Sequence, residues 1–255
     1  MRNVLAIAQK ELRGYFVSPI GWVILGLFAL LFGLFYYAFL GIFVRQSMQM
    51  SQSGGPQSVN VNLYMIRPLL QNTSVIILFV LPMITMRTYA EEKRSGTMEL
   101  LLTSPVTDLE IILGKFIGAL ALYAAMLLVT AVYVGLLFRF GSPEVGPIVS
   151  GYLGLLLLGG GFIAVGLLVS SLTRNQIVAG MATFGTFLML WVISWLGDSA
   201  GPTTRTILSY LSITEHFDDF SKGIIDTKHV IYYLSFIAFG LFLTAKAVDS
   251  ERWRG

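Results

Sequence analysis

The two histidines of the chain are the side chains best suited to bind a metal ion. His216 and His229 lie in one segment with Glu215, Asp218 and Asp219, and imidazole and carboxylate groups are common zinc ligands. The two histidines lack the short fixed spacing of a zinc motif, and the chain has no cysteine. We therefore expect a solvated loop here and no metal site.

No run of residues predicts nucleotide binding or catalysis. A phosphate-binding loop needs Gly-x-x-x-x-Gly-Lys-Ser/Thr, whereas Gly114–Lys115 precedes Phe116 and lacks the earlier glycine. The Gly- and Ser-rich tip at residues 51–56 is typical of a loop rather than of a phosphate cradle. The apolar segments lack the paired polar groups that an intramembrane enzyme needs. We expect no catalytic residue, no enzyme activity and no cofactor bound by this chain.

The composition indicates a protein that lies mainly in a membrane. Of the 255 residues, 55% are hydrophobic and 12% are charged, and the mean hydropathy is +0.76. Soluble domains are about 25% charged, and their apolar residues do not run in long uninterrupted blocks. The net charge of +3 comes from dispersed Lys and Arg residues without interleaved aromatics. We expect contact with membrane lipid and no nucleic-acid binding.

Six apolar segments are long enough to cross a bilayer as helices, which takes about 20 residues each. The predicted spans are residues 20–44, 69–86, 116–138, 148–172, 176–197 and 230–245. The predicted fold class is an all-α membrane protein with a single transmembrane domain, residues 1–255. Lys115, Arg139 and Lys246 fall at span ends, where long side chains can reach the headgroups. Because no ionisable side chain falls in the middle of a span, any transport must be driven from elsewhere.

The distribution of positive charge predicts the orientation of the spans, because cytoplasmic loops retain Lys and Arg. With both termini in the cytoplasm, eleven of the 17 Lys and Arg residues lie inside and six lie outside. The opposite orientation inverts this ratio. The prediction is a multi-pass protein with both termini cytoplasmic.

Short helices are expected outside the spans. Residues 1–18 carry apolar and basic residues at helical spacing, which predicts an interfacial helix on the inner leaflet, ended by Ser18–Pro19. Residues 45–67 are rich in Gln, Ser, Asn and Gly and predict a flexible connector. Residues 198–229 carry two apolar helical faces, which predict two short outer-leaflet helices separated near residues 212–215.

The loop between the second and third spans contains another predicted short helix. Gly96 breaks the charged segment before it, Thr97 can cap the new helix, and Glu99 suits its N-terminal end. Pro105 stops the helix about two turns later. Its apolar residues share one face: Met98, Leu101 and Leu102. A helix this short is unstable alone, so this face must pack on the span ends or on another protein.

Small residues within the spans are expected to serve close helix packing rather than a hinge. They are Gly114 and Gly118, which enter the third span, and Gly159, Gly160, Gly161 and Gly166 of the fourth.

The whole chain resembles the ABC type-2 permease family. The resemblance is carried by the opening run Ile7–Leu12 with the following Tyr15, Phe16 and Ser18–Pro19, by the six spans, and above all by the run Glu91–Val106. The segment Glu215–Asp226 further resembles the GldF/NosY-like branch, which contains permeases of gliding motility and copper-site maturation.

The resemblance implies that the short inner-loop helix is a cytoplasmic coupling helix that docks on a separate ABC ATPase subunit. The coupling residues would be Glu92, Gly96, Thr97, Met98, Glu99, Leu101, Leu102, Ser104 and Pro105. The ATPase subunit would bind ATP and Mg²⁺, and a second permease, identical or related, would complete a dimer in a prokaryotic inner membrane. The implied function is ATP-driven export.

The resemblance also implies a location for the substrate route and leaves a second function open. Spans two and five would line the dimer interface and the route, through Thr73, Ser74, Thr183, Thr186, Met189 and Trp191. In the second function, ATP-driven motion would pass to a periplasmic protein without moving a cargo, as the gliding-motility and copper-maturation relatives suggest.

Overall fold

The computed structural model of the chain describes residues 2–52, 60–103, 105–140, 143–198 and 201–252, and every regular element in these ranges is helical. In chain order the elements are α1 (Arg2–Val17), α2 (Pro19–Gln52), the π-helical segment η1 (Asn62–Ile66), α3 (Arg67–Thr85), α4 (Ala90–Ser95), α5 (Thr97–Leu102), α6 (Asp108–Phe140), α7 (Val145–Ser171), α8 (Gln176–Asp198), α9 (Pro202–Leu211), α10 (Ile213–Ser221) and α11 (Thr227–Arg252).

Six helical stretches of the described chain are long and apolar enough to cross a membrane, which confirms the predicted fold class. They are Pro19–Gln52, Asn62–Ser95, Asp108–Arg139, Val145–Ser171, Gln176–Ile193 and Thr227–Glu251. Most of them extend beyond the predicted spans; α6, for example, begins at Asp108 rather than at residue 116. Adding a residue to an existing helix costs little, so polar flanking residues continue helices that the apolar blocks begin.

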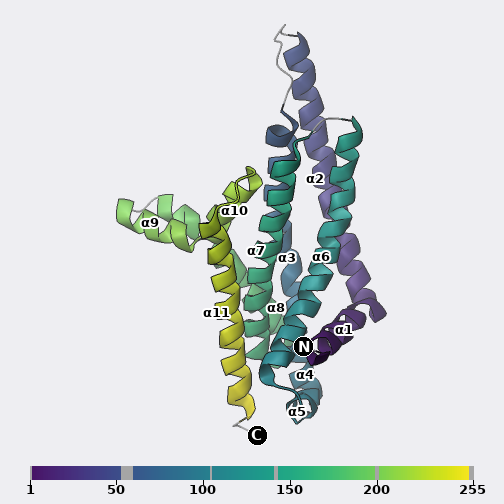
Figure 1. Cartoon of the computed structure of the whole chain (residues 1–255), viewed down its shortest axis with the longest axis vertical. Coiled ribbons are helices and arrows are strands. Elements are labelled where there is room, and N and C mark those ends of the chain that lie inside the picture. Colours follow the sequence, from purple (N-terminus) through teal and green to yellow (C-terminus); the bar gives the residue numbers. More distant parts are fainter. Residues whose placement is uncertain (1, 53–59, 104, 141–142, 199–200, 253–255) are drawn as a thin grey trace.

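The flexible connector predicted for residues 45–67 is wrong in part. α2 continues to Gln52 and η1 already begins at Asn62, while residues 53–59 lie outside the described ranges. At 1.5 Å per residue, the 34 residues of α2 extend about 51 Å, whereas the hydrocarbon layer is roughly 30 Å thick. The C-terminal end of α2 therefore stands clear of the bundle, at the top of Figure 1.

Helices α3 and α7 form the centre of the bundle, and glycines bring α7 close to its neighbours. A Cβ atom at Gly159 would lie 2.2 Å from the Tyr123 ring of α6, and one at Gly166 would lie 2.3 Å from the Thr85 hydroxyl of α3. The Tyr123 hydroxyl donates to the Leu155 carbonyl at 2.7 Å, so the polar end of this buried ring is satisfied. The packing role predicted for the glycines of the fourth span is confirmed.

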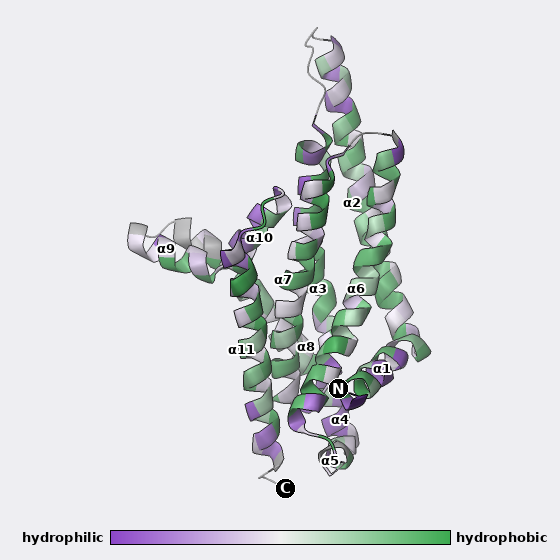
Figure 2. Ribbon diagram, in the orientation of Figure 1, coloured by the Kyte–Doolittle hydropathy of each residue, from purple (hydrophilic) through white to green (hydrophobic). Residues whose placement is uncertain are grey.

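Apolar residues run along much of the outer helices α2, α8 and α11 (Figure 2). Many of their side chains are exposed. In the most apolar stretch of each of these three helices, 17% of the residues are buried inside the chain. The corresponding share is 67% for the stretches that contain α3 and α7. Apolar helix surfaces of this extent are the kind that lipid or another apolar helix covers.

The two ends of the bundle carry different short helices (Figure 1). The helices α1, α4 and α5 gather at the end where α11 finishes, which we call the α4–α5 end. At the other end of α11, α10 lies against the bundle and α9 extends to its side. The two short helices predicted within residues 198–229 are present as α9 and α10, with the break at Ser212, while their place in the outer leaflet stays a prediction.

Candidate functional site

A serine of α7 shapes the corner between α3 and α4. The Ser170 hydroxyl accepts hydrogen bonds from the backbone N–H groups of Tyr89 and Ala90, each at 3.1 Å. It donates to the Met86 carbonyl, also at 3.1 Å. One buried hydroxyl thus satisfies three backbone groups that the end of α3 and the start of α4 leave unpaired. The direction of α4 is set by α7.

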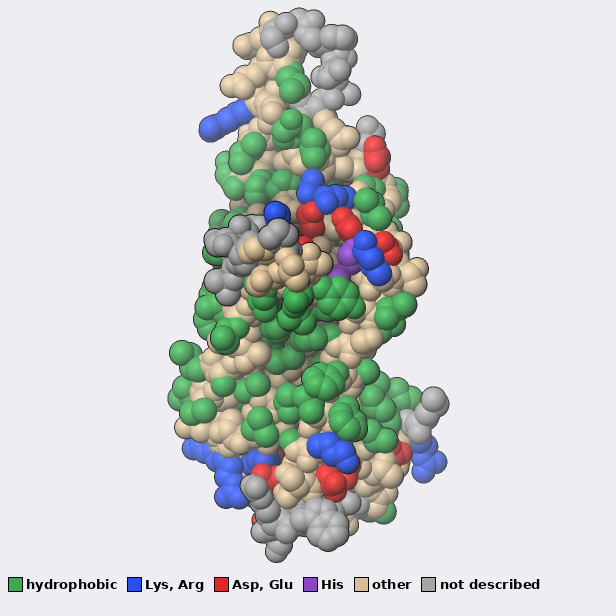
Figure 3. Space-filling view, turned by 90° about the vertical axis from the view of Figure 1, so that its left-hand side faces the viewer, with side chains coloured by type: hydrophobic (Ala, Val, Ile, Leu, Met, Phe, Trp, Pro, Cys, Tyr) green, Lys and Arg blue, Asp and Glu red, His purple; other side chains and the backbone are tan. Residues whose placement is uncertain are grey.

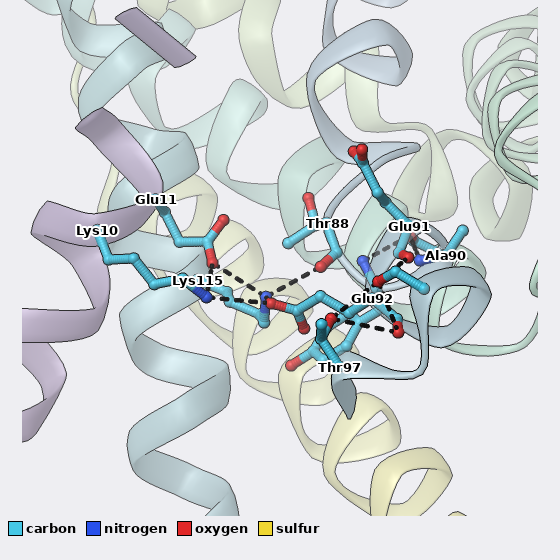
Figure 4. A network of polar contacts seen from close by, with 11 residues as sticks. Lys10, Glu11, Thr88, Ala90, Glu91, Glu92, Thr97 and Lys115 are labelled. Atoms are coloured by element: carbon cyan, nitrogen blue, oxygen red, sulfur yellow. Dashed lines mark hydrogen bonds and ion pairs between the residues drawn. The ribbon is translucent and has the colours of Figure 1, made fainter. Parts of the chain in front are cut away.

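A buried lysine joins three elements at this corner (Figure 4). The Lys115 side chain of α6 is 1% exposed, and its ammonium group lies 3.0 Å from Glu11 of α1 and 2.8 Å from Glu92 of α4. It also donates to the Thr88 carbonyl at 2.9 Å and lies 5.0 Å from the centroid of the Tyr89 ring. The expectation that Lys115 reaches the headgroups is wrong, because α6 begins earlier and α1 and α4 cover this position.

The charges of this cluster are balanced. The ammonium group of Lys10 lies 3.4 Å from Glu92, so two lysines face the carboxylates of Glu11 and Glu92. Breaking a buried ion pair by removing one partner costs about 3–5 kcal/mol, because the other charge stays buried without compensation. A cavity of about 200 Å³ opens beside these groups, between α1 and the α3–α4 corner.

Two glycines of α6 bring α1 into this cluster. A Cβ atom at Gly114 would lie 2.6 Å from the Ile7 side chain, and one at Gly118 would lie 2.7 Å from the Cβ atom of Glu11. α1 therefore crosses α6 at a distance that only glycine permits, and this crossing carries Glu11 to Lys115. The packing role predicted for Gly114 and Gly118 is confirmed.

Helix α4 is also tied to the end of α11. The Lys93 ammonium group lies 2.8 Å from Glu251 of α11 and donates to the Ser171 carbonyl at the end of α7. The Lys93 side chain is 4% exposed and Glu251 is 33% exposed, so the pair is shielded from water on the lysine side. Together with the Lys115 cluster, it connects α4 to α1, α6, α7 and α11.

Helix α5 leaves this fixed corner through a single left-handed residue. Gly96 ends α4 with φ +72°. Thr97 is the first residue of α5, and its hydroxyl lies 2.9 Å from the Ser95 hydroxyl instead of capping the helix from the preceding position. α5 packs mainly against α4, and in Figure 1 both lie at the tip of this end. The structure thus presents a two-turn helix beyond the ends of the spans.

The predicted coupling residues divide into inward-facing and exposed groups. Glu92 points inward to Lys115, and Met98 is 5% exposed and belongs to the core, so Met98 is not displayed as the predicted apolar face requires. The exposed members are Gly96, Thr97, Glu99 and Pro105. Ser104 and the side chains of Leu101 and Leu102 lie outside the described residues. Leu100, which was not among the predicted residues, is 72% exposed.

Several residues of this site were missed from the sequence, namely Glu11, Lys93, Lys115, Ser170 and Glu251. Their partners lie far away along the chain, so no local pattern pairs them. One signal was present: a glycine on each side of Lys115, four residues apart, indicates a helix crossing there. A search for acidic residues on the amphipathic N-terminal helix would then have found Glu11.

The predicted interface residues do not form one surface in this chain. Thr73 and Thr183 are fully buried, and the Thr183 hydroxyl lacks a hydrogen-bond partner among the described atoms. Ser74 and Trp191 line a cavity of about 290 Å³ between α3, α8 and α10. On α8, Thr186 is half-buried and its hydroxyl donates to the Ala182 carbonyl at 2.8 Å, whereas Met189 is 76% exposed.

The solvated loop expected around the histidines is wrong. His216 and His229 are each 6% exposed and contact one another, with Nδ1 atoms 2.6 Å apart. Within the described residues, no group of three or more His, Asp or Glu side chains is arranged to hold a metal ion.

Comparison with known proteins adds a family and two relatives. The profile of the family described as ABC-2 family transporter protein matches residues 5–248. The protein named "Probable multidrug ABC transporter permease YbhR" from Escherichia coli strain K12, and its counterpart from Escherichia coli O157:H7, are each 27% identical to the chain over 146 residues. Each match covers 55% of this chain and 38% of the relative, so the chain spans less than half the length of these proteins.

Proposed function

We propose that this chain, which belongs to the ABC-2 transporter family, is the membrane-spanning permease of an ATP-driven exporter and that α5 couples it to a separate cytoplasmic ATPase subunit. The observation that carries the proposal is the exposed helix α5. It follows directly on α4, which contacts α1, α6, α7 and α11. A six-residue helix is unstable alone, and α5 exposes Leu100 where it leaves the bundle. A groove on a partner protein would supply the missing packing.

The contacts of α4 provide the route for force from the ATPase to the spans. Lys115 links α4 to α1 and α6, and Lys93 links it to α7 and α11. Movement of α5 by the ATPase would therefore tilt a group of connected helices rather than bend one loop. ATP binding would favour one arrangement of these helices and hydrolysis would release it, because each nucleotide state binds one arrangement more tightly. ATP and Mg²⁺ would lie in the ATPase subunit.

The proposed orientation places the α4–α5 end in the cytoplasm of a prokaryotic cell, with both termini there. The excess of Lys and Arg on that side supports it. A second permease would cover exposed apolar side chains of α8, including Met189, and the route for cargo would lie along α3 and α8. The name of the Escherichia coli relatives, a multidrug permease, makes apolar drug-like compounds the first cargo class to test.

A second candidate function is a transducer that passes ATP-driven motion to a periplasmic protein, as in the GldF/NosY-like branch. The length of α2 supports this second function. This helix extends about 51 Å, well beyond the thickness of the hydrocarbon, and its far end would stand in the periplasm. A projecting helix of this kind offers a docking point that a cargo route alone does not need.

Reconstitution distinguishes the two functions. The chain would be co-purified with the ABC ATPase subunit of the same organism and placed in vesicles, with a panel of fluorescent apolar compounds and labelled lipids. Movement of a compound that requires ATP hydrolysis supports the exporter. ATPase activity without movement of any compound, together with ATP-dependent rearrangement of a bound periplasmic protein, supports the transducer. Failure of any ATPase subunit to bind would contradict both.

A further inference from the structure

A chain of hydrogen bonds runs through the two histidines where α9, α10 and α11 meet. The Nε2 atom of His216 lies 2.9 Å from the Tyr210 carbonyl, and the Nε2 atom of His229 lies 2.9 Å from the Asp219 carboxylate. Their Nδ1 atoms face each other at 2.6 Å. Figure 3 shows these histidines, in purple, among acidic and basic side chains on one face of the molecule.

The partners of this chain determine how many protons it holds. A carbonyl oxygen only accepts, so Nε2 of His216 carries a proton. Burial raises the pKa of the Asp219 carboxyl, but hydrogen bonds from His229 and Lys222 outweigh it and hold this pKa below its usual value. The carboxylate is therefore ionised and can only accept, so Nε2 of His229 also carries a proton. With no further proton, two Nδ1 lone pairs would face each other, and with two further protons, two N–H groups would collide. The contact requires one shared proton.

The two rings with this proton carry one positive charge, opposite the carboxylate of Asp219. Burial lowers the pKa of His216, and the neighbouring charges of His229 and Lys228 act in the same direction, although the Tyr210 carbonyl opposes them. This environment disfavours the charged form of the His216 ring. The other titratable groups packed around the pair are Tyr210 of α9, Glu215 and Asp218 of α10, Lys222 just after α10, Tyr232 and Tyr233 of α11, and Arg67 of α3.

A metal ion fits this geometry poorly. Zinc binds histidine nitrogen at about 2.0–2.1 Å, and a tetrahedral angle then separates two ligand nitrogens by about 3.3 Å. The observed 2.6 Å is too short for an ion between the rings and is suited to a short, charge-assisted hydrogen bond.

We propose that His216 and His229 form a proton-binding site that locks α10 to α11. Because α10 is also held by α3 and α7, the lock ties α11 to these helices. Asp218 of α10 lies 3.0 Å from Arg67 of α3, and the Ser150 hydroxyl of α7 donates to the Phe220 carbonyl at 2.8 Å. The pair also lines a cavity of about 740 Å³ whose wall includes Trp195 of α8. The protonation state of the pair thus controls the junction of α10 and α11 at this cavity, whether or not the chain moves a cargo.

The sign of the pH effect follows from the proton count. As pH falls below the lowered pKa of His216, a second proton enters, two imidazolium rings face each other, and the lock opens. As pH rises far enough to remove the shared proton, two lone pairs face each other and the lock also opens. The junction is therefore tightest at intermediate pH and loosens on both sides.

The histidine content of the chain makes a direct test possible. Because the chain has only two histidines, labelling their ring nitrogens with ¹⁵N reports this pair alone in the full-length protein in lipid nanodiscs. The expected spectrum at intermediate pH shows one neutral ring and one imidazolium, coupled through a shared proton. The variant His216→Phe keeps a ring to stack on Tyr232, which lies 3.8 Å from His216 between ring centroids, but removes the acceptor. In this variant the signal of the shared proton is expected to be lost.

Hydrogen exchange of the α10 amides provides the second readout. After correction for intrinsic exchange, protection in the natural chain is expected to peak at intermediate pH, and His216→Phe is expected to remove the peak. The matched control Lys228→Gln changes a neighbouring exposed charge and is expected to retain it. Two rings that titrate independently, or an unchanged protection profile in His216→Phe, would overturn the proposal. Zn²⁺ or Cu²⁺ alone that shifts both Nδ1 signals at one equivalent, reversibly with a chelator, would overturn it in favour of a metal site.

Discussion

The ammonium group of Lys115 lies 2.8 Å from the Glu92 carboxylate, and this contact joins the core helix α6 to the short helix that carries α5. A salt bridge at this place is shielded, because the Lys115 side chain is 1% exposed. It makes α4 a rigid part of the bundle rather than a mobile loop. Four predictions test the site and the orientation built on this contact.

Replacing Lys115 by Met is expected to destabilise the protein by about 3–5 kcal/mol, because Glu11 and Glu92 then lose their buried counter-charge. The measurement is the midpoint of thermal unfolding of the purified protein, followed by tryptophan fluorescence. The control is Lys10→Met, whose side chain is 66% exposed and whose pair contributes about 0–1 kcal/mol. Equal midpoints for the two variants would contradict the buried cluster.

Replacing Leu100 by Asp is expected to weaken binding of the ATPase subunit by about tenfold or more, because a charge would enter an apolar contact. Co-purification from detergent extracts measures it, with the amount of membrane-inserted permease as reference. The control is Leu109→Asp on α6, which is 64% exposed compared with 72% for Leu100. We expect the same loss for the pair Leu101→Asp and Leu102→Asp. Undiminished co-purification of the ATPase subunit with both the Leu100→Asp variant and the Leu101→Asp, Leu102→Asp variant would exclude α5 as the docking element.

Replacing Gly96 by Ala is expected to loosen α5, because φ +72° costs a residue with a Cβ atom about 1–2 kcal/mol. No atom lies within 4 Å of the new Cβ position, so the effect is one of backbone conformation alone. Hydrogen exchange of the α5 amides should become faster. At Gly135, near the C-terminal end of α6, the space is equally open but φ is not positive, so Gly135→Ala should leave α5 unchanged. Unchanged hydrogen exchange of the α5 amides in both variants would argue against the left-handed conformation of Gly96.

Single cysteines are expected to label from opposite sides of the membrane at Ser95 and Ser47. The chain has no cysteine of its own, so each signal is unambiguous, and both positions are exposed. Ser95 ends α4 and should react only from the cytoplasmic side with a reagent that does not cross the membrane. Ser47 lies on the projecting part of α2 and should react only from outside. Labelling of both from one side would overturn the topology.

Local features of the sequence predicted much of the fold. The six spans follow from transfer of apolar blocks into lipid, which depends on about 20 neighbouring residues and on nothing distant. The break at Gly96 and the break at Ser212 were also predicted, since they depend on the backbone preferences of a few residues. The connector at residues 45–67 failed because low hydrophobicity does not end a helix; α2 continues to Gln52.

The sequence by itself determined that this is a membrane protein of six helical spans with a short helix between the second and third. Only the tertiary structure decided that Lys115 meets Glu11 at a separation of 104 residues, and that His216 faces His229 across two helices. The physical reason is that hydropathy and helix propensity act locally along the chain. The pairing of buried charges and rings depends on which helices cross and on how closely glycines such as Gly118 allow them to approach.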